Sequence, residues 1–310
     1  MSIRLFGVAM ALVFSGVTAG CGGAGDNGSS GGGGDGGAGG STDTNAACPA
    51  QTTGTAANHI VVHVSWPDTL GLTAGEGDMH VWTRADLTFD GNDVTGKVTP
   101  CGSIIPALTK SDLAGGGMVQ TEIPDAVWEA ASMPTFEVHG TISGFDAGAT
   151  ITMDPVASVV GATLMDPEND AWPASGAQLT TTDPDGDGQP GILAVPRTDG
   201  EFEAPPLDLQ GALDTNGARA DQVYVATRTA IALAGTRDSC GHAKGTADVS
   251  HVDSHVVGCH VKDGAVCTPE QAKFVDDNQP KFTIKSATYE MVQVPAGASC
   301  ADVRAALPAN

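Results

Sequence analysis

The sequence predicts an all-β fold: a disulfide-bonded β-sandwich or barrel with few short helices. Apolar and polar residues alternate at a period of two along several segments, which is the pattern of strands with one buried face. Helical signals are short and sparse. Six cysteines, an even number, follow residue 47, as expected of a protein held together by three disulfides. These three observations point to strands that pack around one core.

The alternation is clearest near the start of the folded part. Every second residue of 60–66 is apolar and shares one strand face, and the same holds for most of 79–89. Trp82 lies on the opposite face, as a contact residue or a cross-strand partner. Residues 90–93 consist of Asp, Gly and Asn, and such a turn between two alternating segments predicts a hairpin.

Further strands and helices follow along the chain. Strands are expected at residues 135–143, 149–153, 222–233, 245–257 and 281–294. Short helices are expected at residues 125–131, 269–276 and 301–307. Each of these helical segments opens with a capping residue or with an acidic residue in its first turn.

The chain also repeats a pattern of residues. The sequence V-W-T-R at Val81 recurs as V-A-T-R at Val225, 144 residues later. Residues 126–138 and 272–284 share a second pattern at an offset of 146 residues. Two matches in the same order favour a duplication and a pseudo-symmetric barrel or sandwich, and a single irregular sandwich is the alternative. The predicted parts are two halves, 48–165 and 206–310, and an acidic connector, 166–205.

Residues 1–20 have the composition of a secretory signal peptide. Arg4 is the only charged side chain, residues 5–14 form a short apolar run, and small residues precede Cys21. The run Thr18-Ala19-Gly20-Cys21 resembles a bacterial lipobox. This resemblance implies an exported protein that is anchored to the membrane through a lipid on Cys21. The alternative is an ordinary cleaved leader and release into the medium.

Residues 21–47 consist almost entirely of small and polar residues. Such a segment buries too little apolar surface to fold, so we expect a disordered tether in front of a globular domain of residues 48–310. Gly22 stands where some lipoproteins carry the aspartate that retains them in the inner membrane. The resemblance therefore implies the outer membrane of the cell envelope.

The cysteines and the charge limit the compartment and the partners. Six cysteines in an exported chain allow 15 pairings, and we expect each to bond to its nearest remaining partner. The expected pairs are Cys48–Cys101, Cys240–Cys259 and Cys267–Cys300. The formal net charge of −23 excludes nucleic acid and anionic lipid headgroups as partners, because both are polyanions.

One acidic loop carries the most specific motif of the chain. Asp183, Asp185 and Asp187 alternate with Pro184 and Gly186, and Gln189 follows two residues later. Carboxylates at positions one, three and five of a glycine-containing loop place several oxygens around one point, as Ca²⁺ requires. We therefore expect a structural calcium site, and the alternative is a solvated acidic turn.

The segment D-P-D-G-D-G-Q-P-G from residue 183 resembles the calcium loops of thrombospondin type 3 repeats. It occurs once here, and it differs from an EF-hand because Ala194 stands where the bidentate glutamate would be. A further oxygen would have to come from elsewhere in the chain. The candidates are Asp166, Glu168, Asp170, Asp199 and Glu201.

A second group of metal-binding residue types lies on a predicted strand. His251, Asp253 and His255 project from one face, and two imidazoles with a carboxylate could form an open zinc or iron site. The favoured interpretation is a solvated strand face, since Val252 and Val256 take the core side. The pair His59 and His63 has the same two interpretations.

Beyond residue 47 the sequence contains no nucleophile motif and no H-E-x-x-H zinc motif. The lipobox, the tether and the acidic loop together resemble the surface lipoproteins of myxobacteria, and this resemblance implies no particular activity. We expect a lipid-anchored cell-envelope protein with a structural or ligand-binding role and no catalysis. The alternatives are a small-molecule or lipid-binding barrel, or a metal-dependent hydrolase that uses His251, Asp253 and His255.

Overall fold

The computed structural model describes residues 47–69, 71–111, 116–197, 202, 220–261 and 265–309. Residues Ala46–Asn310 form one compact unit. The predicted signal peptide, the lipidation site Cys21 and the tether as far as residue 46 lie outside the described residues.

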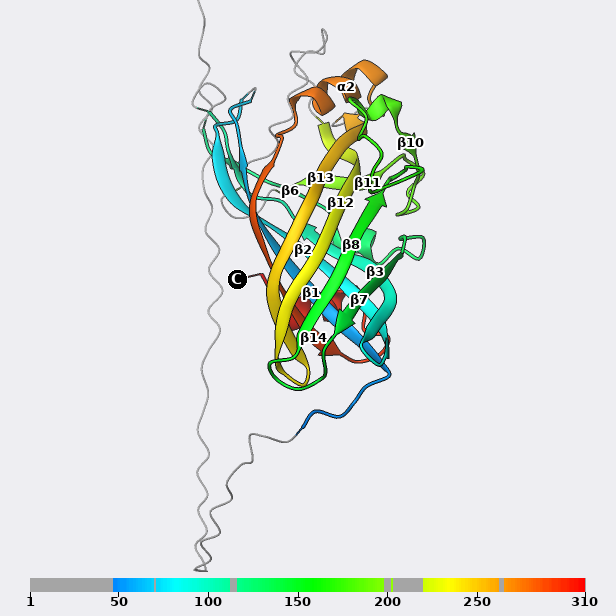
Figure 1. The fold of residues 1–310 in the computed structure, drawn as a ribbon. Helices are drawn as coiled ribbons and strands as arrows, with labels where there is room; N and C mark the ends of the chain where they lie inside the picture. Colours follow the sequence, from blue (N-terminus) through cyan, green and yellow to red (C-terminus); the bar gives the residue numbers. More distant parts are fainter. Residues whose placement is uncertain are drawn as a thin grey trace, which may run out of the picture. The chain divides into compact units, whose positions relative to one another are not determined.

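The main sheet has ten strands, and the eight longest form the body of the barrel (Figure 1). Each of these eight strands pairs antiparallel with the next along the chain, and the last pairs with the first, so the sheet closes into a ring. The eight strands are β1 Thr53–Trp66, β2 Gly75–Asp90, β3 Asp93–Ile104, β7 Phe136–Ile142, β8 Thr150–Val160, β12 Ala220–Ser239, β13 His242–Val261 and β14 Thr283–Val294. The predicted all-β, disulfide-bonded fold is confirmed, and of the two predicted architectures it is the barrel.

Two short strands complete the wall at one end of the barrel. β11 pairs with β12 and with β6, and β6 pairs with β3, so together they bridge β12 to β3 where β7 has ended. The short strands are β4 Leu108–Thr109, β5 Met118–Val119, β6 Thr121–Glu122, β9 Ala162–Thr163, β10 Thr180–Thr181 and β11 Ile192–Pro196. The helices are α1 Asp125–Trp128, the 3₁₀ turn η2 Gly176–Gln178, α2 Pro269–Asn278 and α3 Cys300–Ala306.

The predicted helices all form, and two of them have a reciprocal N-terminal cap. The Thr268 hydroxyl accepts from the backbone N–H of Gln271, whose side chain accepts from the Thr268 N–H, at the start of α2. Ser299 and Asp302 make the same pair of bonds at the start of α3. These capping boxes satisfy backbone donors that the first turn leaves free, which explains why such short helices begin where the sequence predicts.

β12 and β13 are longer than predicted, because bulges interrupt their alternation, whereas β14 begins two residues later than predicted. β13 has 20 residues, and its pairing with β12 shifts register between Ala230 and Ile231. The partners of these two residues are His251 and Val249, so Ser250 is the extra residue of a β-bulge. As a result Val249 and Val252 both belong to the interior core although they are three residues apart.

The main core lies inside the ring, as the alternation predicts. The apolar residues of β1 and β2 that share one face, including Trp66, are buried there. The end of the barrel away from α2 is filled: Phe89 and Phe145 meet edge to face at 5.2 Å, and Arg237 donates to the Phe145 carbonyl oxygen. Side chains therefore close this end of the barrel.

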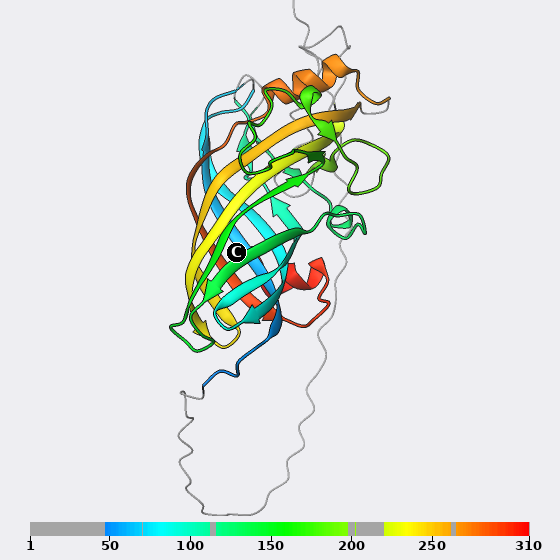
Figure 2. The same ribbon diagram turned by 45° about the vertical axis from the view of Figure 1, so that its right-hand side comes forward.

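A smaller core lies on the outside of the barrel under α3, which Figure 2 shows in red against the outer wall. Trp82 is buried there, and its Nε1 donates to the carbonyl oxygen of Leu307 at 2.7 Å. It also stacks on His59 of β1, with ring centroids 4.6 Å apart. The interpretation of Trp82 as a cross-strand partner is therefore confirmed.

The disulfides are Cys48–Cys240, Cys101–Cys300 and Cys259–Cys267. The expected pairing of nearest cysteines is wrong for all three bonds. Closure of the barrel brings the end of the chain back to its start: Cys48, before β1, meets Cys240 in the turn between β12 and β13, 192 residues away, and Cys101 of β3 meets Cys300 at the start of α3, 199 residues away. Three disulfides indicate an extracellular or otherwise oxidising compartment.

The order of elements shows two similar sets. Without the short strands and η2, the order strand, strand, strand, helix, strand occurs as β1, β2, β3, α1, β7 and again as β8, β12, β13, α2, β14. Val81 and Val225, which the sequence repeat aligns, both line the interior. The second set begins at Thr150, so the acidic segment 166–205 lies within it, between β8 and β12.

The burial of His59 predicts that the stability of the protein depends on pH. Burial, followed by the neighbouring His80, lowers the pKa of His59 from 6.5 to about 4, although Glu290 opposes this shift. The unfolded chain therefore binds more protons than the folded chain between pH 4 and 6.5, and stability falls as the pH drops through this window. Acidification should therefore lower the free energy of unfolding by about 1–2 kcal/mol less in His59→Gln than in the unmodified protein.

Urea unfolding at pH 7 and pH 4.5 measures this difference for His59→Gln against the unmodified protein. The matched control is His139→Gln, since His139 is exposed on β7. An equal loss of stability on acidification in the unmodified protein and in His59→Gln would contradict the assignment.

Candidate functional site

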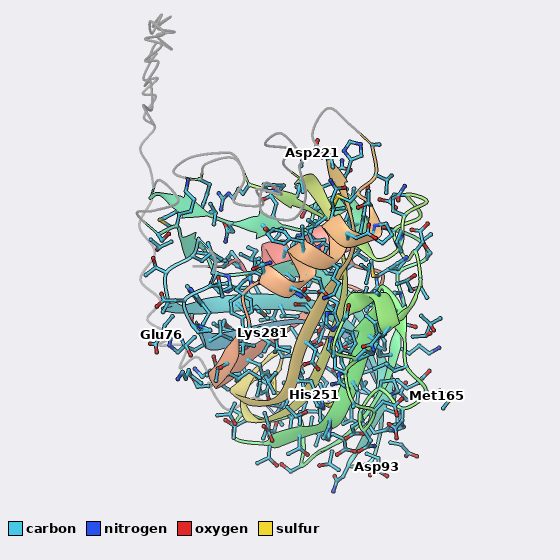
Figure 3. The ribbon with its side chains drawn as sticks, turned by 90° about the horizontal axis from the view of Figure 1, so that it is seen from above. Glu76, Asp93, Met165, Asp221, His251 and Lys281 are labelled. Carbon is cyan, nitrogen blue, oxygen red and sulfur yellow. A yellow bond between two sulfur atoms is a disulfide. The ribbon has the colours of Figure 1, made fainter. Side chains whose placement is uncertain are left out.

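The half of the barrel nearer α2 contains a cavity of about 880 Å³. Its walls are the inward faces of strands that include β2, β8, β12 and β13, and α2 contributes Phe274 and Val275. Apolar side chains such as Val81, Trp128 and Val225 form much of the lining. Figure 3, which looks down on this end of the barrel, shows α2 lying across it.

Hydroxyl groups interrupt the apolar lining. The Oγ atoms of Ser158 on β8 and Thr229 on β12 lie 3.2 Å apart. On β2, the hydroxyl of Thr83 accepts from the Nδ2 of Asn58 at 3.1 Å. Asn58 is 4% exposed, and its Oδ1 has no hydrogen-bond partner among the described residues.

The charged residues that the structure describes in the lining lie at the margins of the cavity. Asp68 and Lys110 lie on connecting segments next to the strand ends, and Asp68 accepts from the backbone N–H of Ala74. The carboxylate of Asp253 pairs with the guanidinium of Arg228, which is 2% exposed. The Arg228 side chain also donates to the carbonyl oxygen of Asp170, so this ion pair belongs to the outer face of the barrel.

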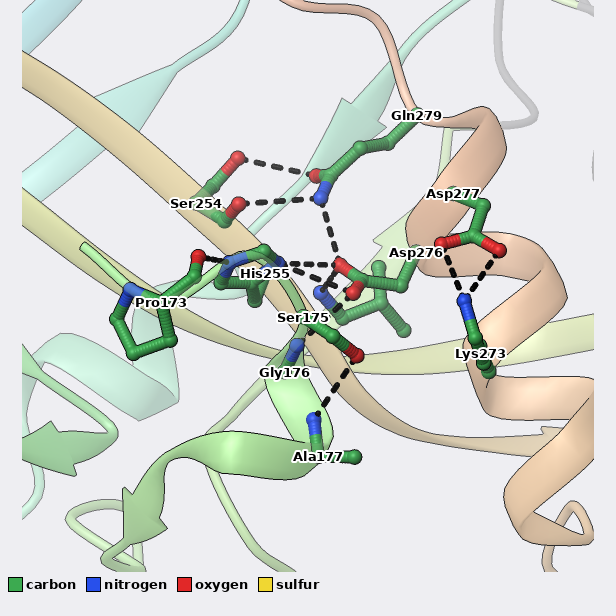
Figure 4. Close-up of polar contacts among 11 residues, drawn as sticks. Pro173, Ser175, Gly176, Ala177, Ser254, His255, Lys273, Asp276, Asp277 and Gln279 are labelled. Carbon is green, nitrogen blue, oxygen red and sulfur yellow. Dashed lines mark hydrogen bonds and ion pairs between the residues drawn. The ribbon is translucent and has the colours of Figure 1, made fainter.

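α2 is fastened to the barrel by a buried carboxylate (Figure 4). Asp276 is 4% exposed and accepts from the backbone N–H groups of Gly176 and Val256, both at 2.9 Å. It also pairs with the Nδ1 of His255 at 2.8 Å, while the Nε2 of His255 lies 2.7 Å from the Pro173 carbonyl oxygen. One side chain of α2 thus joins β13 to the segment around η2.

The face with His251, Asp253 and His255 is not the solvated surface that the sequence predicts. Trp172 stacks on His255 at 5.5 Å and lies under the guanidinium of Arg228, so the segment after β9 covers this face. His255 faces Asp276, whereas Asp253 pairs with Arg228 and lies 3.6 Å from the Nδ1 of His251. His251 and Asp253 therefore meet beside Arg228, while His255 turns toward α2, so the three side chains do not gather around one point.

The acidic loop does bring its carboxylates together. Within the part of the chain that the structure describes, Asp183, Asp185 and Asp187 are the one group of His, Cys, Asp or Glu residues close enough to share a metal ion. Ligand atoms of the three lie within 4.8 Å of one another. None of the described candidates for a further oxygen joins them, and Asp199 and Glu201 lie outside the described residues. This exposed group could hold a metal ion.

Backbone donors shape the loop from within. Asp183 accepts from the N–H groups of Gly186, Asp187 and Gly188, and Asp187 accepts from that of Gln189. Gln189 therefore contributes its backbone N–H to the hydrogen bonds of the loop. Gly186 and Gly188 both have positive φ, which allows the tight curl that these bonds require.

The carboxylates differ in their electrostatic environment. Burial raises the pKa of Asp185, and the charge of Asp187 raises it further. The pKa of Asp183 is lowered. Desolvation alone would raise this pKa, but hydrogen bonds from the backbone N–H groups of Gly188 and Gly186 outweigh that effect. One Asp185 oxygen accepts from Leu193 at the start of β11, and the other is buried without a partner among the described residues.

No protein-family model, curated protein or solved structure matches this chain. The cavity and the acidic loop are therefore the two features from which a function can be inferred. None of the helices in the described residues combines the length and the apolar character of a membrane-spanning segment.

The sequence showed the loop but not the cavity. Thr83 and Thr227 line the cavity at matching positions of the repeat, and both interrupt an otherwise apolar strand face. Polar residues at inward positions are the signal that could have indicated an interior with space for a ligand. That signal has meaning only once the closed ring is known.

Proposed function

We propose that this protein binds a hydrophobic small molecule inside its barrel. The cavity is the observation that supports this function. Protein interiors are packed with few voids larger than a water molecule, whereas this barrel keeps about 880 Å³. Ligand pockets span roughly 300–1,000 Å³ and are mostly apolar with a few polar groups, as this cavity is.

The lining supports binding rather than catalysis. Among the described residues that form the cavity, Asp68, Lys110 and Asp253 are the ones with charged side chains, and Asp253 is paired with Arg228. A general base or nucleophile must lie within hydrogen-bond reach of the reacting atom. Among its described residues, the cavity lining contains Thr and Ser hydroxyls but no histidine or cysteine.

The proposal can be tested by a substitution that fills part of the cavity with a larger side chain. Thr227 faces the cavity from β12, and a tryptophan there would occupy part of the space. We expect the protein to bind about one equivalent of the neutral dye Nile red, and Thr227→Trp to weaken binding at least about tenfold through loss of cavity volume. Fluorescence titration and native mass spectrometry of protein purified without detergent measure both effects.

The control is Thr288→Trp, because Thr288 is exposed on the outer face of β14. Equal dye binding by Thr227→Trp and Thr288→Trp would place the dye outside the barrel. Absence of both dye binding and a copurified ligand would contradict the proposed function.

We also propose that the acidic loop binds Ca²⁺ and stiffens the barrel wall. Carboxylate oxygens suit a hard cation, and the charge of Asp187 beside Asp185 would be neutralised by it. The loop is attached to the wall, since Ser132 donates to the Pro184 carbonyl oxygen and Leu193 of β11 donates to Asp185. Ala194 of the same strand lines the cavity.

Calcium should raise the melting temperature. We expect about 1 mM Ca²⁺ to stabilise the protein by about 0.4–1.4 kcal/mol, because extracellular calcium modules have dissociation constants of roughly 10⁻⁴–10⁻³ M. Asp183→Asn/Asp187→Asn should abolish the effect, whereas Asp154→Asn/Asp248→Asn, with the same change of charge at exposed sites, should retain it. Calorimetry without calcium uptake, or an equal thermal shift in both double variants, would refute the site.

The proposed location is the cell envelope, with a lipid on Cys21 as the anchor. The lipobox supports the anchor, and the disulfides support an oxidising compartment. Mass spectrometry of the mature N-terminus, after expression in a host that processes lipoproteins, should show a lipidated Cys21. A mature chain with an unmodified N-terminus would contradict the anchor.

A further inference from the structure

We infer that the ligand of the barrel is a neutral amphiphile: a hydrocarbon body with one uncharged hydroxyl or carbonyl group. The inference rests on the proposed function and specifies the class of molecule. It depends on the distribution of charges and hydroxyls around the cavity.

Among the described residues of the lining, charged side chains lie at the strand ends or in an ion pair, and the rest of the lining is uncharged. The described charged residues of the lining are Asp68 and Lys110 at the strand ends and Asp253, whose carboxylate is bound to Arg228. A buried charge without a partner is strongly unfavourable. The net charge of −23 opposes anionic ligands further.

The interior does hold hydrogen-bonding groups, on two opposite walls. β2 and β12 are four strands apart around a ring of eight, so Thr83 and Thr229 face each other across the barrel. Ser158 lies beside Thr229. A hydroxyl inside an apolar cavity is unfavourable unless it has a partner, and a ligand oxygen would supply one.

Asn58 leaves the hydrogen of the Thr83 hydroxyl available. Its Nδ2 donates to the Thr83 oxygen, so that oxygen is already used as an acceptor. Within the described residues nothing accepts the hydroxyl hydrogen, which can therefore donate to an acceptor in the cavity. A ligand hydroxyl or carbonyl accepts such a bond without carrying a charge.

Three ligands with the same chain length separate the possibilities. We expect 1-dodecanol to displace Nile red from the unmodified protein at a concentration at least about tenfold lower than dodecanoate or dodecyltrimethylammonium does. Tighter binding of either ion would overturn the inference. If Nile red itself does not bind, the proposed function fails and the inference fails with it.

Substitution of the hydroxyls tests the second half of the inference. Thr83→Val and Thr229→Val keep the shape of the side chain, and each should lower the affinity for dodecanol relative to dodecane by about 2–10-fold, the value of one hydrogen bond. Thr288→Val on the outer face is the control and should leave this ratio unchanged. Circular dichroism confirms that each variant is folded. An unchanged ratio in both cavity variants would show that the hydroxyls do not recognise the ligand.

Discussion

Replacement of Asp276 by alanine should lower the free energy of unfolding by about 3–5 kcal/mol, the cost of removing one partner from a buried charged network. Asp276 accepts from two backbone N–H groups and faces His255, and all three would lose this partner inside the protein. An unsatisfied buried donor is more unfavourable than the loss of the bond alone. Urea unfolding followed by circular dichroism measures the difference.

The same substitution should loosen α2 over the cavity. Phe274 and Val275 of α2 line the cavity, so a loosened helix should release Nile red faster, by about tenfold or more if the closed position loses 1.4 kcal/mol. Asp277→Ala is the matched control on the same helix, because Asp277 forms an exposed pair with Lys273 and should contribute less than about 1 kcal/mol. Similar stability losses in the two variants would contradict the role assigned to Asp276.

Removal of the Cys101–Cys300 disulfide should have the second large effect. The bond joins residues 199 apart in sequence and holds the start of α3 against β3. Such a long loop restricts the unfolded chain strongly, so Cys101→Ser/Cys300→Ser should lose about 4–5 kcal/mol on the chain-entropy model. Trp82, which α3 covers, should then become accessible, and quenching of tryptophan fluorescence by acrylamide should increase.

The control for this effect is the Cys259–Cys267 bond. It closes a loop with a sequence separation of 8, so its removal should lose only about 2–3 kcal/mol. It should also leave Trp82 covered. Equal losses for the two bonds, or an unchanged quenching of Trp82 without Cys101–Cys300, would show that the disulfide does not hold α3.

Local patterns were sufficient for most of the strands and helices. The hairpin of β2 and β3 follows from a period of two on both sides of the turn at residues 90–93, and both features are local. The extra length of β13 was not predictable, since a bulge at Ser250 changes the phase of the alternation. Its position depends on how β12 and β13 pair along their whole length.

The two candidate sites also differ in how far they could be predicted from local sequence. The acidic loop has its carboxylates within nine residues, and the glycines that let it curl lie between them, so the cluster was visible from the sequence. The cavity depends on which residues face one another across a ring. Thr83 and Thr229 are 146 residues apart, and nothing in their neighbourhoods indicates that they share a cavity.

The sequence by itself determined the strands, the helix starts, the even set of cysteines and the acidic loop, because propensity, capping and turn chemistry act over a few residues. The tertiary structure decided the closure of the ring, the disulfide partners and the burial of His255 under Trp172. These depend on contacts between segments far apart in the chain. The cavity belongs to the second group, since the space inside a barrel is set by the strands that surround it.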